Sequence, residues 1–413
     1  MSMHAKNLLL ELLAIPSINP AFGGPEKSWL GEGKLTDFLQ ELVQSRGWRW
    51  LRQEVHPGRE NLVAWVPGTS ADTSPRKITL WEVHQDTVGV EGLKVAPDVG
   101  TLREGRIYGR GACDVKGAMA AMFTALVEVT ETNQLQRDVL LAFMINEECG
   151  FTGAKALSRL WSESSETGDS KIAEQTHGTL GLDELRALRP TRALVAEPTD
   201  LSVVAAHKGL VRWRCHTRGR AAHSSQPHLG KNAIYDMQEV IGAIRTFDAE
   251  VLAMRGADCM CGRPTISVNA IQGGTGANVV ADHVAIDIDF RLMPGGDPLE
   301  ALQELKGFIA ERISSTVVVE HDAPWNQGRG LAAGTNQAWA EKVAGVVRST
   351  GLPGEIMGVP YGTDAWVFAA LGIPTVICGP GSIAQAHTED EWISLAELDR
   401  GVEVYRRLAG GMP

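Results

Sequence analysis

Charged and imidazole side chains stand directly after several apolar runs that are typical of buried strands. They are His84 and Asp86 after the run 78–83, Glu147 and Glu148 after the run 138–145, and Glu197 after the run 192–196. In open α/β sheets, ligands gather beyond the carboxyl ends of the strands. We therefore expect these side chains to meet at one edge of a sheet, where they could hold a metal ion.

The pair His84 and Asp86 has a spacing that is common in metal sites. The imidazole can bind the ion, while the carboxylate accepts the other ring N–H and fixes the tautomer. Taken alone, such a pair is more often a structural histidine beside a solvated aspartate. Two further groups favour the metal interpretation, because Asp114 precedes a predicted helix and His387 precedes the acidic stretch "TEDEW".

The types of these side chains restrict the ion and the chemistry. Two imidazoles and several carboxylates, with no thiolate required, suit Zn²⁺, Co²⁺ or Mn²⁺. Two ions about 3.5–4 Å apart would need one carboxylate shared between them. The adjacent pair Glu147 and Glu148 favours a division of roles, with one glutamate as ligand and the other as general base. Taken singly, either could instead be a helix cap or a surface carboxylate.

Length and composition exclude several classes of protein. The chain of 413 residues is long enough for two or three domains. Its net charge of −11 and the lack of a basic block argue against nucleic acid as a partner. Its six cysteines show no paired zinc spacing, and we interpret them as reduced thiols of a cytoplasmic protein. No apolar run approaches the ~18 residues of a membrane span, so we expect no membrane association.

The predicted elements indicate an α/β protein with a mostly parallel sheet and an inserted α+β domain. The sheet domain is expected over residues 1–204 and again over 324–413. Between them, residues 205–323 carry alternating strands and amphipathic helices in the order β-α-β-β-α-β, which is typical of a ferredoxin-like unit. The polar stretch 162–177 is interpreted as a solvated surface insertion.

Motifs along nearly the whole chain carry a resemblance to a known family. They are "HQDTV" at 84, "YGRGACDVKG" at 108, "NEECGFTGA" at 146, "AEPTD" at 196, "AHKG" at 206, "GRAAHSSQPHLGKNAI" at 219, "GGTGANVV" at 273, "DFRLMPG" at 289, "YGTDA" at 361 and "GPGSIAQAHTEDEW" at 379. In this order and spacing, they make the chain similar to the co-catalytic zinc amidohydrolases and exopeptidases. That family includes acetylornithine deacetylase, succinyl-diaminopimelate desuccinylase, aminoacylases and glutamate carboxypeptidases.

The resemblance implies a zinc-exopeptidase-like catalytic domain that binds two divalent ions, with Zn²⁺ first and Co²⁺ or Mn²⁺ as alternatives. The implied metal ligands are Asp114, which bridges the ions, His84 and Glu197 at one ion, and Glu148 and His387 at the other. Asp86 would orient His84. Glu147 would be the base that deprotonates the water and later protonates the leaving nitrogen.

The resemblance also assigns a lid and dimerisation role to residues 205–323. In a homodimer, His223 would reach the active site of the partner subunit and polarise the scissile carbonyl. Asn278 and Arg291 would bind the substrate carboxylate, although Arg291 could instead form a salt bridge at a strand end. Thr363 could line the pocket or cap the next helix. A cis peptide bond is expected after Asp114.

The expected substrate is a small N-acyl amino acid. Within the family, the final motif with "AEPTD" and "AAHSS" is most similar to acetylornithine deacetylases, which implies hydrolysis of N-acetylornithine in arginine biosynthesis. A desuccinylase, an aminoacylase, a metallo-carboxypeptidase and a dipeptidase stay open as alternatives. A non-catalytic binding protein would be expected to lose a ligand or the base, and none is lost. A carboxylate-bridged oxidase would place its ligands on a four-helix bundle instead of at strand ends.

Overall fold

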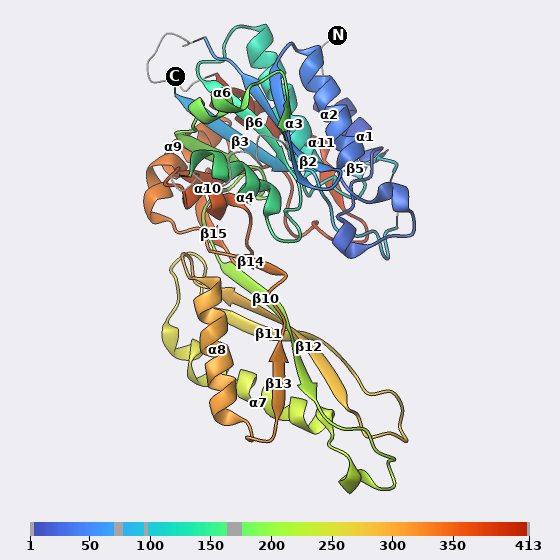
Figure 1. Cartoon of the computed structure of the whole chain (residues 1–413). Helices are drawn as coiled ribbons and strands as arrows, with labels where there is room; N and C mark the ends of the chain where they lie inside the picture. The colour runs from blue at the N-terminus through green and yellow to red at the C-terminus, as the bar shows by residue number, and fades with distance from the viewer. Residues whose placement is uncertain (1–3, 70–76, 95–97, 163–175, 411–413) are drawn as a thin grey trace. The chain divides into compact units, whose positions relative to one another are not determined.

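The computed structural model describes residues 4–69, 77–94, 98–162 and 176–410. The chain divides into two compact units, of which the first comprises Met1–Ala205, Ala333–Met357 and Thr363–Pro413, and the second Ala206–Ala332 and Gly358–Gly362. The second unit extends past the expected limit at 323, because β14 (Asn326–Gly328) pairs with β10 (Gly209–Arg218). Each unit has its own main sheet (Figure 1).

The first unit is built on a nine-stranded sheet in the order β15-β9-β16-β8-β3-β6-β2-β1-β7. Its strands are β1 (Arg49–His56), β2 (Arg59–Val66), β3 (Ile78–His84), β6 (Asp138–Met144), β7 (Thr176–Gly178), β8 (Arg192–Val195), β9 (Val203–His207), β15 (Ile356–Val359) and β16 (Thr375–Ile377). The central strands β16, β8, β3 and β6 run parallel, and strands β2, β1 and β7 follow antiparallel. Every residue of β3 and β6 is buried, as strands covered on both faces require.

The helices of the first unit pack around this sheet (Figure 1). They are α1 (Ala5–Leu13), α2 (Gly33–Ser45), α3 (Lys116–Glu131), α4 (Thr152–Ser158), α6 (Leu182–Ala187), α9 (Gln337–Ser349), α10 (Ala365–Ala369) and α11 (Leu395–Ala409), with short 3₁₀ turns at Pro20–Phe22, Lys27–Trp29, Arg159–Trp161 and Gly334–Asn336. Helix α3 is buried over nearly its whole length and packs against α1 and α11. A helix that is apolar on all sides is expected in such an interior position.

A small three-stranded sheet lies where the sequence predicts a loop over 89–105. β4 (Thr101–Arg103) pairs with β5 (Arg106–Tyr108), and β5 pairs with β17 (Trp392–Ser394). The loop prediction is wrong here, because Glu104 and Gly105 both adopt positive φ angles, of 51° and 74°, and form a two-residue hairpin turn.

The polar insertion expected over 162–177 is also revised at its end. Residues 163–175 lie outside the described residues. Thr176 and His177, which were expected to be loop, belong to β7, and β7 pairs antiparallel with β1 at the edge of the sheet.

The second unit is an antiparallel sheet in the order β11-β12-β10-β13, with β14 beside β10. Its elements are β10, α7 (Ala233–Glu250), β11 (Thr265–Gly273), β12 (His283–Leu292), α8 (Pro298–Arg312), β13 (Val318–His321) and β14, with 3₁₀ turns at Pro227–Leu229 and Leu252–Arg255. The elements from β10 to β13 follow the predicted order β-α-β-β-α-β. None of the described helices, in either unit, is long and apolar enough to cross a membrane.

Alternation along β10 explains how this second sheet is built. Trp213 is fully buried in the apolar core between the sheet and α7 and α8, whereas its neighbours Arg212 and Arg214 are partly exposed. Directly across on β12, Asp289 accepts from Arg212 at 2.9 Å and Asp287 accepts from Arg214 at 2.6 Å. One face of the sheet is thus apolar, and the other carries cross-strand ion pairs.

Candidate metal centre

Three neighbouring parallel strands bring polar groups to one edge of the sheet in the first unit. Strand β3 lies between β8 and β6 and runs parallel to both. His84 ends β3, Glu147 follows β6, and Glu197 follows β8. Because parallel strands place their carboxyl ends at the same edge, these side chains gather there.

Two groups of metal-ligating side chains converge at this edge, and both contain Asp114. One group consists of His84, Asp114 and Glu197, and the other of Asp114, Glu148 and His387. Within each group, the ligand atoms lie within 4.8 Å of one another. His84 Nε2 is 3.0 Å from Oδ1 of Asp114, and His387 Nε2 is 3.2 Å from Oδ2. Asp114 therefore presents one carboxylate oxygen to each group.

The orientation of His84 suits a bound cation. Its Nδ1 lies 2.8 Å from the backbone carbonyl of Asp86, and a carbonyl can only accept, so Nδ1 carries the proton. In a neutral ring, Nε2 then directs a lone pair toward the Asp114 carboxylate, and a positive charge between them would relieve the repulsion. The donor set of imidazoles and carboxylates without a thiolate fits Zn²⁺ and similar ions.

Negative charge is concentrated around the ligands. Burial, followed by the charge of Glu197, raises the pKa of Glu147 well above its ordinary value. Burial and the charge of Asp114 raise the pKa of Glu197 in the same way. Asp364 is buried near Glu82, and burial raises the pKa of Asp364 to about 6. Divalent cations at the centre would offset this crowding of carboxylates.

His387 closes the second ligand group from the long loop before β17. Its side chain is 51% exposed, and its Nε2 lies 3.2 Å from Oε1 of Glu148 as well as close to Asp114. Burial disfavours protonation of the ring, but hydrogen bonds to Asp114 and Glu148 outweigh this effect and raise the pKa of His387 to about 10. The imidazole is thus held by the same carboxylates with which it would share an ion.

Asp86 connects the end of β3 with the loop that carries the two glutamates. Its carboxylate accepts from the backbone N–H groups of Glu147 at 3.0 Å and Glu148 at 3.2 Å, and from the side-chain amide of Asn19 at 2.7 Å. Its Oδ1 is 3.8 Å from His84 Nδ1, whereas its own backbone carbonyl makes the hydrogen bond to that ring. Asp86 therefore contacts His84 through the main chain and fixes Glu147 and Glu148 through its carboxylate.

Glu391 is a supporting residue that sequence reasoning missed. It is fully buried, and its carboxylate accepts from the backbone N–H groups of Cys113 at 2.8 Å and Asp114 at 2.9 Å. Arg110 pairs with its other oxygen at 2.6 Å. Glu391 therefore holds the turn that presents Asp114, and the peptide bond after Asp114 is cis, as expected from the resemblance. Its position four residues after His387 is the signal that could have indicated it.

The remaining predicted residue of the first unit, Thr363, lies at the start of α10. It is buried, and its hydroxyl oxygen accepts from the backbone N–H of Ala365 at 3.2 Å. The N-cap residue of α10 is Asp364 and makes no side-chain capping hydrogen bond, so the Thr363 contact is a local turn just before the helix.

Three predicted site residues belong to the second unit. His223 is exposed and forms an isolated strand bridge with Val279, beside Asn278. The backbone N–H of Ser225 donates to His223 Nδ1 at 3.2 Å. Arg291 makes an ion pair with Asp289 at 2.9 Å, which corresponds to the salt-bridge alternative for this residue.

The fold and the site together define a class of protein. The sequence matches Peptidase family M20/M25/M40 over residues 80–410, and the chain belongs to this family. It is therefore a metallohydrolase, with candidate ligands for a dinuclear metal site in the two groups that share Asp114. The family and the fold class predicted from the motifs are confirmed.

Relatives of this chain are named either acetylornithine deacetylase or carboxypeptidase. The chain is 29% identical to an acetylornithine deacetylase of Proteus mirabilis, over 97% of this chain and 95% of that protein. It is 26% identical to a protein of Emericella nidulans named "Probable carboxypeptidase", over 96% of this chain and 87% of that protein. The crystal structure of an M20 family metallo-carboxypeptidase from Sulfolobus solfataricus matches the fold with a TM-score of 0.71 and 19% identity, over 98% of both chains.

Proposed function

We propose that this protein hydrolyses the amide bond of an N-acyl amino acid, with N-acetylornithine as the preferred substrate. The observation that carries the proposal is the pair of ligand groups sharing Asp114, next to which Glu147 directly precedes the ligand Glu148. Asp114, His84 and Glu197 would hold one ion, and Asp114, Glu148 and His387 the other. When bound, the two ions would supply Lewis acids that acidify a water and polarise the scissile carbonyl.

Glu147 is the proton carrier of the proposed reaction. Its backbone is fixed by the Asp86 carboxylate, and its side chain belongs to neither ligand group. A carboxylate held beside the ligand Glu148 without being a ligand itself can accept the proton of the attacking water. The same proton can then pass to the nitrogen of the departing amino acid.

His223 is the proposed donor to the scissile carbonyl, acting in the partner subunit of a homodimer that forms through the second unit. Because the backbone N–H of Ser225 donates to Nδ1, the neutral ring carries its proton on Nε2. Nε2–H is therefore a hydrogen-bond donor of the kind that stabilises a developing oxyanion. Asn278, which follows in the same unit, is proposed to bind the substrate carboxylate.

Arg291 is proposed to share that role despite its ion pair. Asp289 also pairs with Arg212, at 2.9 Å, so one carboxylate serves two guanidinium groups. Together, the two guanidinium groups and the single carboxylate carry a net positive charge. A substrate carboxylate could neutralise that charge.

The choice of N-acetylornithine rests on two cations near the metal centre that already have partners, and on the relatives' names. Lys116, two residues after Asp114, is buried and donates to the carbonyls of Leu12 and Ile15, and Arg110 is paired with Glu391, so both cations are committed to the fold. A succinyl group would require another cationic or amide partner. The deacetylase of Proteus mirabilis also matches over 97% of this chain.

A carboxypeptidase is the second candidate, and the protein of Emericella nidulans supports it. A peptide's last residue is itself an amino acid acylated on nitrogen with a free carboxylate, so the same site chemistry serves both reactions. The two functions differ in the acyl group that the site must accommodate, which is a small acetyl group in one case and the rest of a peptide in the other.

The first prediction compares substrates directly. Turnover of N-acetylornithine, N-succinyl-diaminopimelate and an N-blocked dipeptide would be measured with Zn²⁺ and with Co²⁺. We expect kcat/KM for N-acetylornithine to exceed that for each competitor by more than ~10-fold, equivalent to ~1.4 kcal/mol of transition-state binding. Faster turnover of the dipeptide would replace the deacetylase proposal with the carboxypeptidase, and turnover of none would reject both.

A further inference from the structure

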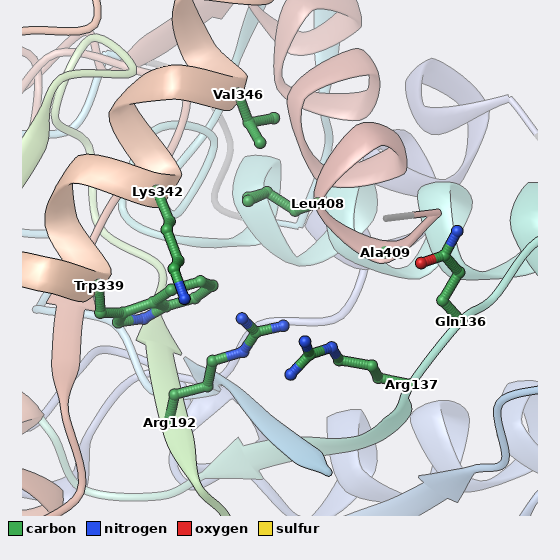
Figure 2. A pocket seen from close by; sticks show the side chains of 8 residues that line it. All are labelled: Gln136, Arg137, Arg192, Trp339, Lys342, Val346, Leu408 and Ala409. Atoms are coloured by element: carbon green, nitrogen blue, oxygen red, sulfur yellow. The ribbon is translucent and has the colours of Figure 1, made fainter. Parts of the chain in front are cut away.

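A pocket lined by cationic side chains lies at the opposite edge of the central sheet in the first unit (Figure 2). Arg137 directly precedes β6, and Arg192 begins β8. Because both strands run parallel to β3, this edge is remote from the carboxyl ends that carry the metal ligands. Lys342 and Trp339 of α9 also line the cavity, Lys342 with a third cation and Trp339 with its indole ring. The cavity has a volume of about 240 Å³.

Arg192 is held in place on two sides. Its Nε donates to the hydroxyl of Thr79 at 2.9 Å, and its guanidinium group lies 4.2 Å from the centre of the Trp339 ring. The indole is fixed in turn, because Trp339 Nε1 donates to the carbonyl of Ala193 at 2.7 Å. Such a pre-positioned guanidinium fork is suited to bidentate binding of an oxyanion.

The cations of this pocket have no acidic partner among the described residues. Figure 2 shows the guanidinium groups of Arg137 and Arg192 directed toward one another, and none of the described residues that line the cavity is acidic. Burial, followed by the charge of Arg137, lowers the pKa of Arg192 to about 10, which still leaves it charged at neutral pH. Arg137 is half-buried and Lys342 is exposed.

We propose that this pocket is a binding site for a small phosphate-class anion, either inorganic phosphate or the phosphate group of a monoester. A doubly charged anion between Arg137 and Arg192, with Lys342 above it, would convert a repulsive cluster into charge-assisted hydrogen bonds. Because the Arg192 guanidinium already covers the Trp339 ring, the cavity offers no open aromatic surface for a nucleobase. A compact anion therefore fits better than a nucleotide.

The test is calorimetric titration of the metal-loaded protein with inorganic phosphate, at constant ionic strength set with chloride. We expect Arg137→Gln and Lys342→Gln each to raise the Kd for phosphate at this site by at least about tenfold. Arg245→Gln, which removes an exposed cation from α7 in the second unit, serves as the matched control and should leave the Kd unchanged. Thermal melting without phosphate establishes that each variant is folded.

The outcomes separate this site from the metal centre. Phosphate that binds only to the metals would bind equally well to Arg137→Gln, Lys342→Gln and the parent protein, and that result would overturn the proposal. Absence of measurable binding to the parent protein would overturn it as well. A parallel titration with glycerol 3-phosphate distinguishes the two sources, because tighter binding of the ester assigns the site to a phosphomonoester and weaker binding assigns it to inorganic phosphate. The readout is binding and does not depend on the proposed hydrolase activity.

Discussion

Glu147 and Glu148 are adjacent in the chain but are expected to respond differently to the same substitution. Glu147 belongs to neither ligand group, whereas Glu148 lies with Asp114 and His387. We predict that Glu147→Gln keeps nearly the full metal content and lowers kcat by at least ~10², because only the proton carrier is lost.

The control for this prediction is Glu148→Gln, which should lose metal as well as activity. Metal analysis and steady-state kinetics on both variants decide between the roles. Loss of the ions from Glu147→Gln, or kinetics near those of the parent protein, would contradict the assignment of the base.

The candidate ligands were predicted from the sequence only because motif context singled them out, and their role as ligands stays a prediction. Each of the five has a side chain that can bind a metal ion, but such side chains are also common as helix caps and surface carboxylates: His84, Asp114, Glu148, Glu197 and His387. The supporting contacts could not be predicted in this way. Asn19 reaches Asp86 across 67 positions of sequence, and such a contact depends on tertiary packing instead of local pattern.

At the scale of elements, the buried parallel strands were predictable and the marginal ones were not. The apolar runs at 78–83, 138–145 and 192–196 became β3, β6 and β8 because strands covered on both faces must be continuously apolar. Strand β1 was missed because its sequence, "RWLRQEVH", is largely polar and gains its pairing from β2 and β7. The short strands β4 and β5 were missed because three-residue strands carry too little pattern.

The turn before α3 provides a prediction at the same scale. Glu391 is buried against Arg110 and the backbone around Asp114. We predict that Glu391→Gln lowers the free energy of unfolding by about 3 kcal/mol, because it leaves a buried guanidinium without its counter-charge. Urea denaturation measures this change.

The same acidic stretch offers a matched control. Glu389 is exposed and pairs with Lys94 at 3.2 Å, so Glu389→Gln should cost less than about 1 kcal/mol. Equal effects of the two substitutions would show that the Glu391 contacts contribute no more than a surface ion pair.

At the scale of the whole molecule, the proposed dimer makes a prediction about shared sites. A chain with His223→Ala and a chain with Glu147→Gln should each be inactive alone. When they are mixed, a dimer of the two should regain one working site of two, because the intact His223 of one chain serves the intact Glu147 of the other. Activity after mixing is the measurement, under conditions in which mass spectrometry shows subunit exchange. No recovery under those conditions would remove the proposed role in the partner subunit.

The central claim is that two ions, held by side-chain groups that share Asp114, are required for amide hydrolysis. The most direct measurement is the rate of N-acyl amino acid hydrolysis as chelated protein is titrated with Zn²⁺ and bound metal is counted per chain. The account predicts that chelation abolishes hydrolysis, that activity returns and saturates near two ions per chain, and that Asp114→Asn fails to retain both ions. Full-rate hydrolysis by the metal-depleted protein, or two tightly bound ions in Asp114→Asn, would contradict it.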